Sequence, residues 1–199
     1  MAFQLTAVLI LLAFYGCYFG KMVLQKKKGI QTDQIGKGKT GLVKRIEVVM
    51  KIATLLVPAA EAVSIVLNRS RLPLWARVTG TLLGALGVLV FMCAVFTMRD
   101  SWRAGVSETD ETELVTRGIY QVSRNPAFLG FDLVYIGILL MFFNWVLFAV
   151  SVFAMLMLHL QIVNVEEDFL VRTFGQAYLD YRKKVCRYFG RKPGHTSVK

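Results

Sequence analysis

The chain has 199 residues, of which 55% are hydrophobic and 19% charged, and its mean hydropathy is +0.52. Soluble domains carry about 45–50% apolar and about 25% charged residues, so this composition argues against an ordinary soluble globule. The 12% aromatic residues also argue against a disordered chain, and the three cysteines include no CxxC pair that would indicate a zinc ribbon. The formal net charge of +11 indicates either a protein that binds nucleic acid or a membrane protein, depending on where the charges lie.

Five apolar stretches approach the roughly 20 residues that a helix needs to cross a bilayer. They cover residues 3–24, 46–67, 78–98, 127–143 and 145–165. The first stretch has no basic residues before it, unlike a signal peptide. The fourth is short, and the chain passes through Asn144 and Trp145 directly into the fifth, which predicts a tight hairpin. We expect an all-α integral membrane protein, with residues 1–199 forming a single domain and residues 166–199 a cytoplasmic tail.

The basic residues predict the orientation of these spans. Nineteen Lys and Arg residues fall between the first and second stretches, after the third, and in the tail, all on one side of the membrane. The other side holds Arg69, Arg71 and Arg77. Because cytoplasmic loops are enriched in Lys and Arg, the N-terminus is expected outside and the C-terminus in the cytoplasm. The charge is then a topology signal, and no nucleic-acid partner is expected, since no aromatic–basic stripe or zinc-finger spacing occurs.

Polar and small residues within the spans divide into functional and packing candidates. Glu61 is the most interior charge of the second span, where it can face a neighbouring helix or serve a function. Gly80 and Gly84 have the spacing that lets helix backbones approach closely, which favours packing. The glycine- and lysine-rich segment before Thr40 resembles the end of a P-loop, but Asp33 stands where the first glycine should be.

The most informative region lies between residues 108 and 188. Asn125 and Pro126 read as the N-cap and first residue of the fourth span, which places a helix N-terminus at the cytoplasmic interface. Such an end can hold a carboxylate or a phosphate. The fifth span ends in acidic residues, and the hairpin should bring Arg124 and Asn125 near Glu166 and Glu167. This arrangement suits a zwitterionic ligand, and a plain ion-pair network is the alternative.

The order and spacing of several short motifs here resemble the membrane-embedded methyltransferases. That superfamily contains the isoprenylcysteine carboxyl methyltransferases and the phospholipid N-methyltransferases. The motifs are Leu114-Val115-x-x-Gly118-x-Tyr120-x-x-x-Arg124-Asn125-Pro126-x-Phe128-x-Gly130, Glu166-Glu167 and Phe174-Gly175-x-x-Tyr178-x-x-Tyr181. They cover about 80 residues, with weaker support from the loop at residues 32–39.

The resemblance implies that S-adenosylmethionine binds at the cytoplasmic face. Its implied cofactor-binding residues are Thr112, Glu113, Leu114, Val115, Tyr120, Asn125, Pro126, Gly130 and Glu166. Arg124 and Glu167 are the catalytic candidates, with Glu167 as the partner of Glu166. His159 and Ile162 are the candidates for contacting the acceptor, and no metal is expected.

Two departures from the carboxyl methyltransferase pattern bear on the acceptor. Asn125 stands where that subfamily usually has histidine, and Phe128 stands for tyrosine. Asn cannot titrate near neutral pH, so a proton-transfer role there is not expected. Ile162 occupies the position of an arginine that handles the acceptor carboxylate, so a carboxylate acceptor would need another cation such as Arg124 or Arg172.

Taken with the resemblance, the sequence predicts a membrane methyltransferase acting on a lipid-like or other hydrophobic acceptor that arrives from the bilayer. Prenylcysteine carboxyl O-methylation and phospholipid N-methylation both remain open. The competing hypothesis is a non-catalytic lipid-binding or transport subunit. A cell inner membrane is the expected location, and an amphipathic helix after Gly175 is expected to lie on the inner leaflet or to close over the cofactor.

Overall fold

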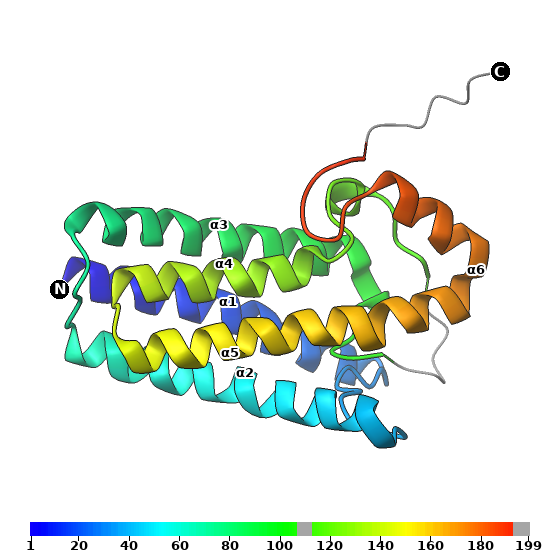
Figure 1. The fold of residues 1–199 in the computed structure, drawn as a ribbon, viewed down its shortest axis with the longest axis horizontal. Coiled ribbons are helices and arrows are strands. Elements are labelled where there is room, and N and C mark those ends of the chain that lie inside the picture. The colour runs from blue at the N-terminus through cyan, green and yellow to red at the C-terminus, as the bar shows by residue number, and fades with distance from the viewer. Residues whose placement is uncertain (107–112, 193–199) are drawn as a thin grey trace.

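A computed structural model of the chain describes residues 1–106 and 113–192, and these form a helical bundle (Figure 1). Its elements are α1 (Ala2–Lys27), α2 (Gly41–Leu67), α3 (Leu74–Met98), the 3-10 turns η1 (Arg99–Ser101) and η2 (Gly118–Gln121), α4 (Pro126–Met141), α5 (Trp145–Gln161), the π-helical turn η3 (Ile162–Glu166) and α6 (Glu167–Lys184). The all-α prediction is therefore confirmed over the described residues.

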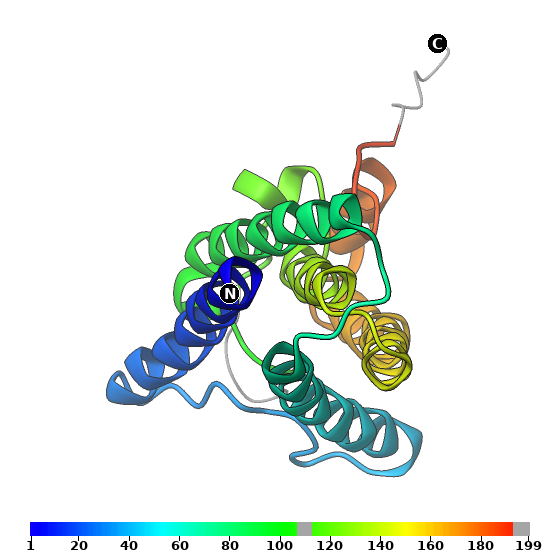
Figure 2. The ribbon, with the colours of Figure 1, turned by 90° about the vertical axis from the view of Figure 1, so that its left-hand side faces the viewer.

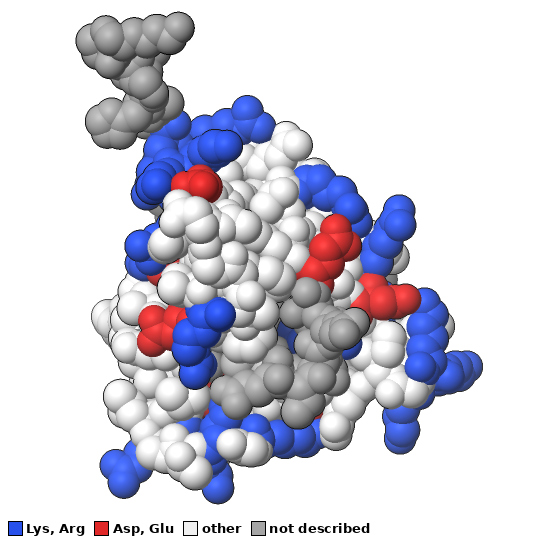
Figure 3. Space-filling model, turned by 90° about the vertical axis from the view of Figure 1, so that its right-hand side faces the viewer, with Lys and Arg blue, Asp and Glu red and all other residues white. Residues whose placement is uncertain are grey.

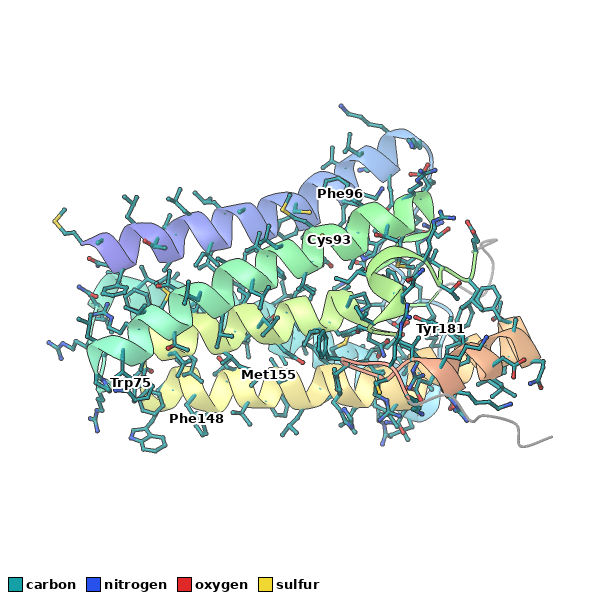
Figure 4. The ribbon with its side chains drawn as sticks, turned by 90° about the horizontal axis from the view of Figure 1, so that it is seen from above. Trp75, Cys93, Phe96, Phe148, Met155 and Tyr181 are labelled. Atoms are coloured by element: carbon teal, nitrogen blue, oxygen red, sulfur yellow. The ribbon has the colours of Figure 1, made fainter. Side chains whose placement is uncertain are left out.

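Four helical segments are long and apolar enough to cross a membrane: α1, α2, α3 continued through η1, and the helix that runs from Trp145 to Lys184. The fourth expected span, α4, has 16 residues and rises about 24 Å, less than the roughly 30 Å hydrocarbon core. Large apolar side chains cover the outside of the bundle, among them Trp75 and Phe96 of α3 (Figure 4). The protein is a multi-pass membrane protein.

Several expected boundaries differ from the structure. Helix α2 begins at Gly41 rather than at residue 46, and α3 begins at Leu74 rather than at residue 78. The α4–α5 connection is Phe142–Asn144, and Trp145 is already the first residue of α5, because the Asn144 side chain caps that helix by accepting a hydrogen bond from Leu147 N at 2.9 Å. The fifth span does not end at residue 165, since the helix continues through η3 into α6.

Helices α3 and α4 pack closely because glycines face one another. A Cβ atom added to Gly80 would lie 2.5 Å from the Gly137 carbonyl oxygen, and one added to Gly87 would lie 2.8 Å from Val134 N. Added to Gly130, a Cβ would lie 2.8 Å from the Phe91 side chain. The packing interpretation of the third-span glycines is confirmed, and these contacts hold α4 in the middle of the bundle.

Helices α1 and α2 diverge toward the end of the bundle that carries α6 (Figure 2). The loop between them is tied to the segment after α3. Gln25 donates to the Trp102 carbonyl at 2.9 Å and accepts from Thr32 Oγ1 at 2.6 Å. Backbone bonds join Gln34 N to Ala104 O at 2.9 Å and Ala104 N to Thr32 O at 3.0 Å. This frame holds α1 and α2 apart at that end.

Helix α6 bends back over the end of the bundle at Gly175, which has φ 51° and ψ −125°. This backbone conformation favours glycine. The expected amphipathic segment follows: Tyr178 and Tyr181 are buried, and Lys183 and Lys184 are exposed. Its apolar face packs on the chain's own residues, Leu114 among them. Lys and Arg side chains surround this end of the molecule (Figure 3).

Candidate functional site

A cluster of four side chains joins the start of α4 to α6 and the C-terminal segment. Arg124 lies 3.0 Å from Glu167 and donates to the Tyr178 hydroxyl at 2.7 Å. Arg187 donates two hydrogen bonds to the same carboxylate, at 2.7 and 3.1 Å. The bond to Glu167 raises the pKa of the Arg187 guanidinium. We call Arg124, Glu167, Tyr178 and Arg187 the Arg124 cluster.

Backbone contacts fix this cluster in place. Arg124 N donates to the Cys186 carbonyl at 3.1 Å, and the Tyr181 hydroxyl donates to the Tyr120 carbonyl at 2.6 Å. Asn125 donates through its side chain to the Arg187 carbonyl at 3.1 Å. The C-terminal segment is therefore held over the turn that begins α4.

The expected capping role of Asn125 is wrong in one respect. Asn125 stands at the N-cap position, and Pro126 is the first helical residue, as predicted. The Asn125 side chain, however, makes no capping hydrogen bond to the first turn. Its amide instead reaches across to the C-terminal segment, because that segment lies directly against the turn.

Glu166 points into a second group, which we call the Glu166 cluster: Lys39, Glu47, Gln161 and Glu166. The Gln161 amide donates to Glu47 at 3.3 Å and to Glu166 at 3.4 Å. Lys39 forms an ion pair with Glu47, whose side chain is completely buried. The expectation that Glu166 and Glu167 share one group with Arg124 therefore holds for Glu167 alone. Successive side chains of a helix point about 100° apart, so these two acids face different neighbours.

Tyr120 lies between the two clusters. Its carbonyl binds Tyr181 of α6, and its hydroxyl interacts electrostatically with Glu166. Burial raises the pKa of this hydroxyl, so it stays protonated at neutral pH. Val115 is buried beside Tyr120, and Leu114 packs against Tyr178 and Tyr181. Leu114 and Tyr120 thus contact α6 near the Arg124 cluster, Val115 packs beside Tyr120, and Glu166 belongs to the Glu166 cluster.

The remaining predicted residues lie elsewhere. Glu113 is exposed and pairs with Arg117 at 3.5 Å, and Thr112 lies outside the described residues. Gly130 packs against α3, where its missing Cβ leaves room for Phe91, and its cofactor contact stays a prediction. His159 Nδ1 is 2.6 Å from the Tyr188 hydroxyl. Ile162 is completely buried at the start of η3.

An apolar cavity of about 460 Å³ lies between α1, α2 and α4. Its α4 wall begins with Ala127 and Phe128, directly after the Asn125–Pro126 turn. Phe19 of α1 and Leu55 of α2 also line it and are 54% and 62% exposed, so the cavity opens toward lipid between these helices. Lys51 and Asp33, an ion pair at 2.7 Å, line its polar side.

Several residues of the site were missed from the sequence. Glu47 and Arg187 lie outside the motifs, and Lys39 ends the loop at residues 32–39, which supports the resemblance only weakly. A signal was present for Glu47, since an acid at the start of an apolar helix is costly unless it has a partner. The π-helical turn at Ile162–Glu166 was also missed, and such turns are frequent at functional sites.

The fold and the site define a class: multi-pass membrane proteins with a polar site at one end of the bundle, beside an apolar cavity. The family model described as phospholipid methyltransferase matches residues 75–177, just over half of the chain. The chain belongs to this family. The matched segment runs from the start of α3 into α6 and contains the start of α4, both glutamates and Tyr120.

Curated relatives carry the name protein-S-isoprenylcysteine O-methyltransferase. The one from Saccharomyces cerevisiae is 32% identical over 110 residues, which cover 54% of this chain and 46% of the relative. Those from Mus musculus and Homo sapiens are 32% and 31% identical over 113 and 116 residues, covering 56% of this chain and 40% of each relative. The chain thus matches less than half the length of these relatives.

Proposed function

We propose that the chain transfers a methyl group from S-adenosylmethionine to a hydrophobic acceptor that enters from the bilayer. Membership of the phospholipid methyltransferase family and the relatives named as methyltransferases support this proposal. The main structural support is that the cavity proposed for the acceptor adjoins the turn proposed for the cofactor. The apolar cavity begins at Ala127 and Phe128, immediately after the turn that the resemblance assigns to the cofactor.

The residues around Tyr120 fit the polar groups of the proposed cofactor. The cofactor combines an ammonium, a carboxylate and ribose hydroxyls, which need both acceptors and donors. Gln161 Oε1 and Arg124 Nε are buried and have no hydrogen-bond partner within the described residues. Gln161 Oε1 can therefore accept a hydrogen bond from a ligand in the Glu166 cluster, and Arg124 Nε can donate one in the Arg124 cluster. Glu166, Tyr120, Leu114, Val115 and the Arg124–Pro126 turn would hold the cofactor.

When bound, the cofactor supplies a methyl group on a positively charged sulfur. Displacement at such a carbon needs in-line placement of the acceptor and exclusion of water more than it needs a base. Arg124 and Glu167 bind each other and the C-terminal segment, so we assign them a positioning role in place of the catalytic role expected from the sequence. They hold that segment closed over the turn.

The acceptor would occupy the cavity between α1, α2 and α4. Its apolar part would enter past Phe19 and Leu55, and its polar end would reach the start of α4. Ile162 is buried and apolar, so it offers no charge to a carboxylate acceptor. Lys51 lines the cavity and would supply a cation for an anionic acceptor by exchanging its partner Asp33. His159 binds Tyr188, so any role in acceptor binding would be through the C-terminal segment.

We further propose that residues 1–199 act as one membrane-embedded unit in a cell inner membrane. The N-terminus would lie outside, and α6 and the C-terminus in the cytoplasm. The nineteen Lys and Arg residues assigned to one side of the membrane support this orientation.

The test uses membranes containing the full chain and methyl-radiolabelled S-adenosylmethionine. We expect label in an organic-soluble product and at least a tenfold lower rate for Glu166→Ala. Base-labile label released as methanol would identify a carboxyl acceptor, and base-stable label an amine. Asp180→Ala is the matched control, because the Asp180 side chain is 51% exposed, pairs with Lys183 at 3.0 Å and belongs to neither cluster. Equal transfer by wild type and Glu166→Ala, or no transfer at all, would contradict the proposal.

A further inference from the structure

A second cavity lies at the opposite end of the bundle from α6, between α2 and α5. Its volume is about 550 Å³. We call it the α2–α5 groove, and its apolar walls are Leu56, Ala59, Ala60 and Val63 of α2 with Val146 and Val150 of α5. The ends of these helices lie side by side in Figure 2. The groove shares no lining residue with the cavity beside α4.

The groove is open to the surrounding lipid. Leu56, Val63 and Val146 are 53%, 59% and 69% exposed. All three belong to helices long and apolar enough to cross the membrane. From Leu67 to Leu56 the helix rises about 16 Å, close to half of the roughly 30 Å hydrocarbon core. The depth of the groove therefore matches one acyl chain in one leaflet.

Two cations stand at the mouth of the groove. Arg69 and Arg71 line it and come from the short connection between α2 and α3. Neither has a hydrogen bond or ion pair to another described residue, whereas Arg77 binds Asn68 at 2.9 Å and lies over the ring of Phe3. The connection contains no Asp or Glu, and neither does α5. The charge of these two guanidinium groups is therefore left for an external anion.

We propose that the α2–α5 groove binds an anionic glycerophospholipid from the leaflet at this end. The guanidinium groups of Arg69 and Arg71 would hold the phosphate, for which their planar donor geometry is suited. One acyl chain would lie in the groove against Ala59 and Ala60. The site is separate from the methyl-transfer site and does not depend on the proposed function.

Native mass spectrometry of the detergent-solubilised full chain tests this proposal. The probes are a palmitoyl-oleoyl phosphatidylglycerol, the matching phosphatidylcholine and free glycerol 3-phosphate. We expect the anionic lipid to be retained most strongly. Retention should fall at least tenfold in the Arg69→Ala/Arg71→Ala double variant. Lys44→Ala/Arg45→Ala is the matched control, because it removes two exposed charges at the other end and should leave retention unchanged.

A second variant keeps the test independent of the charges. Ala59→Phe adds a ring inside the groove at an exposed position, and it should also reduce lipid retention while Arg69 and Arg71 remain. Equal loss in the control pair would show general charge attraction and overturn the proposal. Retention unaffected by both groove variants, or equal binding of free glycerol 3-phosphate, would overturn it as well. Binding of S-adenosylhomocysteine at the other end should not change in any of these variants.

Discussion

Arg124 is the residue on which the closed C-terminal segment depends most. Its side chain and that of Glu167 are 5% and 8% exposed. Arg187 also binds Glu167, whereas Glu167 is the only carboxylate paired with Arg124 in the described structure. Removing Glu167 therefore leaves the buried Arg124 guanidinium without a counter-ion, which costs about 3–5 kcal/mol. We expect Glu167→Ala to lower the free energy of unfolding by about that amount, measured by denaturation in detergent. Arg117→Ala is the control, because its pair with Glu113 is exposed and is worth at most about 1 kcal/mol. Equal losses in the two variants would contradict this assignment.

Glu61, in contrast, is expected to destabilise the folded state. It is completely buried within α2, and neither carboxyl oxygen has a hydrogen-bond partner among the described residues. An unsatisfied buried polar group costs about 1–3 kcal/mol, so Glu61→Leu should raise the melting temperature. Glu47→Leu, in the same helix, should lower it, since Glu47 accepts from Gln161 and pairs with Lys39. Destabilisation by Glu61→Leu would show that this carboxyl has a partner after all.

At the residue scale, the sequence predicted the contact of Arg124 with Glu167, because a hairpin brings the two ends together. It did not separate Glu166 from Glu167. Successive helical side chains point about 100° apart, but which of the two acids faces Arg124 depends on the π-helical turn at Ile162–Glu166. The sequence also did not predict Glu47 as a site residue. Its partners are Gln161 of α5 and Lys39 of a loop whose path is fixed by bonds to residues 102–104.

At the scale of elements, the glycines between α3 and α4 decide how closely these helices approach. Gly137→Ala should destabilise the protein, because its Cβ would lie 2.6 Å from Gly84 N and the helices would have to separate. Gly16→Ala is the matched control: nothing lies within 4 Å of its Cβ, so better helix propensity should stabilise by up to about 1 kcal/mol. Thermal unfolding of both variants in detergent measures the difference, and similar behaviour would contradict the packing assignment.

Hydropathy alone predicted that the helices exist, but it did not predict where several of them begin and end. Residues 41–45 are more polar than a membrane span, yet they belong to α2, since a helix can extend beyond the hydrocarbon core. The fifth helix continues into α6 because no proline or glycine interrupts it before Gly175. At Gly175 the chain bends, and the amphipathic half of α6 turns onto residues 114–123.

At the scale of the whole molecule, the distribution of charge predicts the orientation. A reporter active only outside the cytoplasmic membrane, fused after residue 199, should be inactive. The same reporter inserted into the connection between α2 and α3 should be active, because that connection lies at the other end of the bundle. Activity at the C-terminus and inactivity at the connection would reverse the topology and place the Arg124 cluster outside.

The proposed methyltransferase places its cofactor and its acceptor on adjoining parts of the structure: the cofactor between the Arg124 and Glu166 clusters, and the acceptor in the cavity beside α4. The most direct measurement is calorimetric binding of S-adenosylmethionine to the detergent-solubilised full chain. Wild type should bind one equivalent, and Glu166→Ala and Asn125→Ala should each weaken binding at least tenfold, while the Asp180→Ala control should not. Absence of binding to the folded wild type, or binding that neither variant changes, would contradict the account.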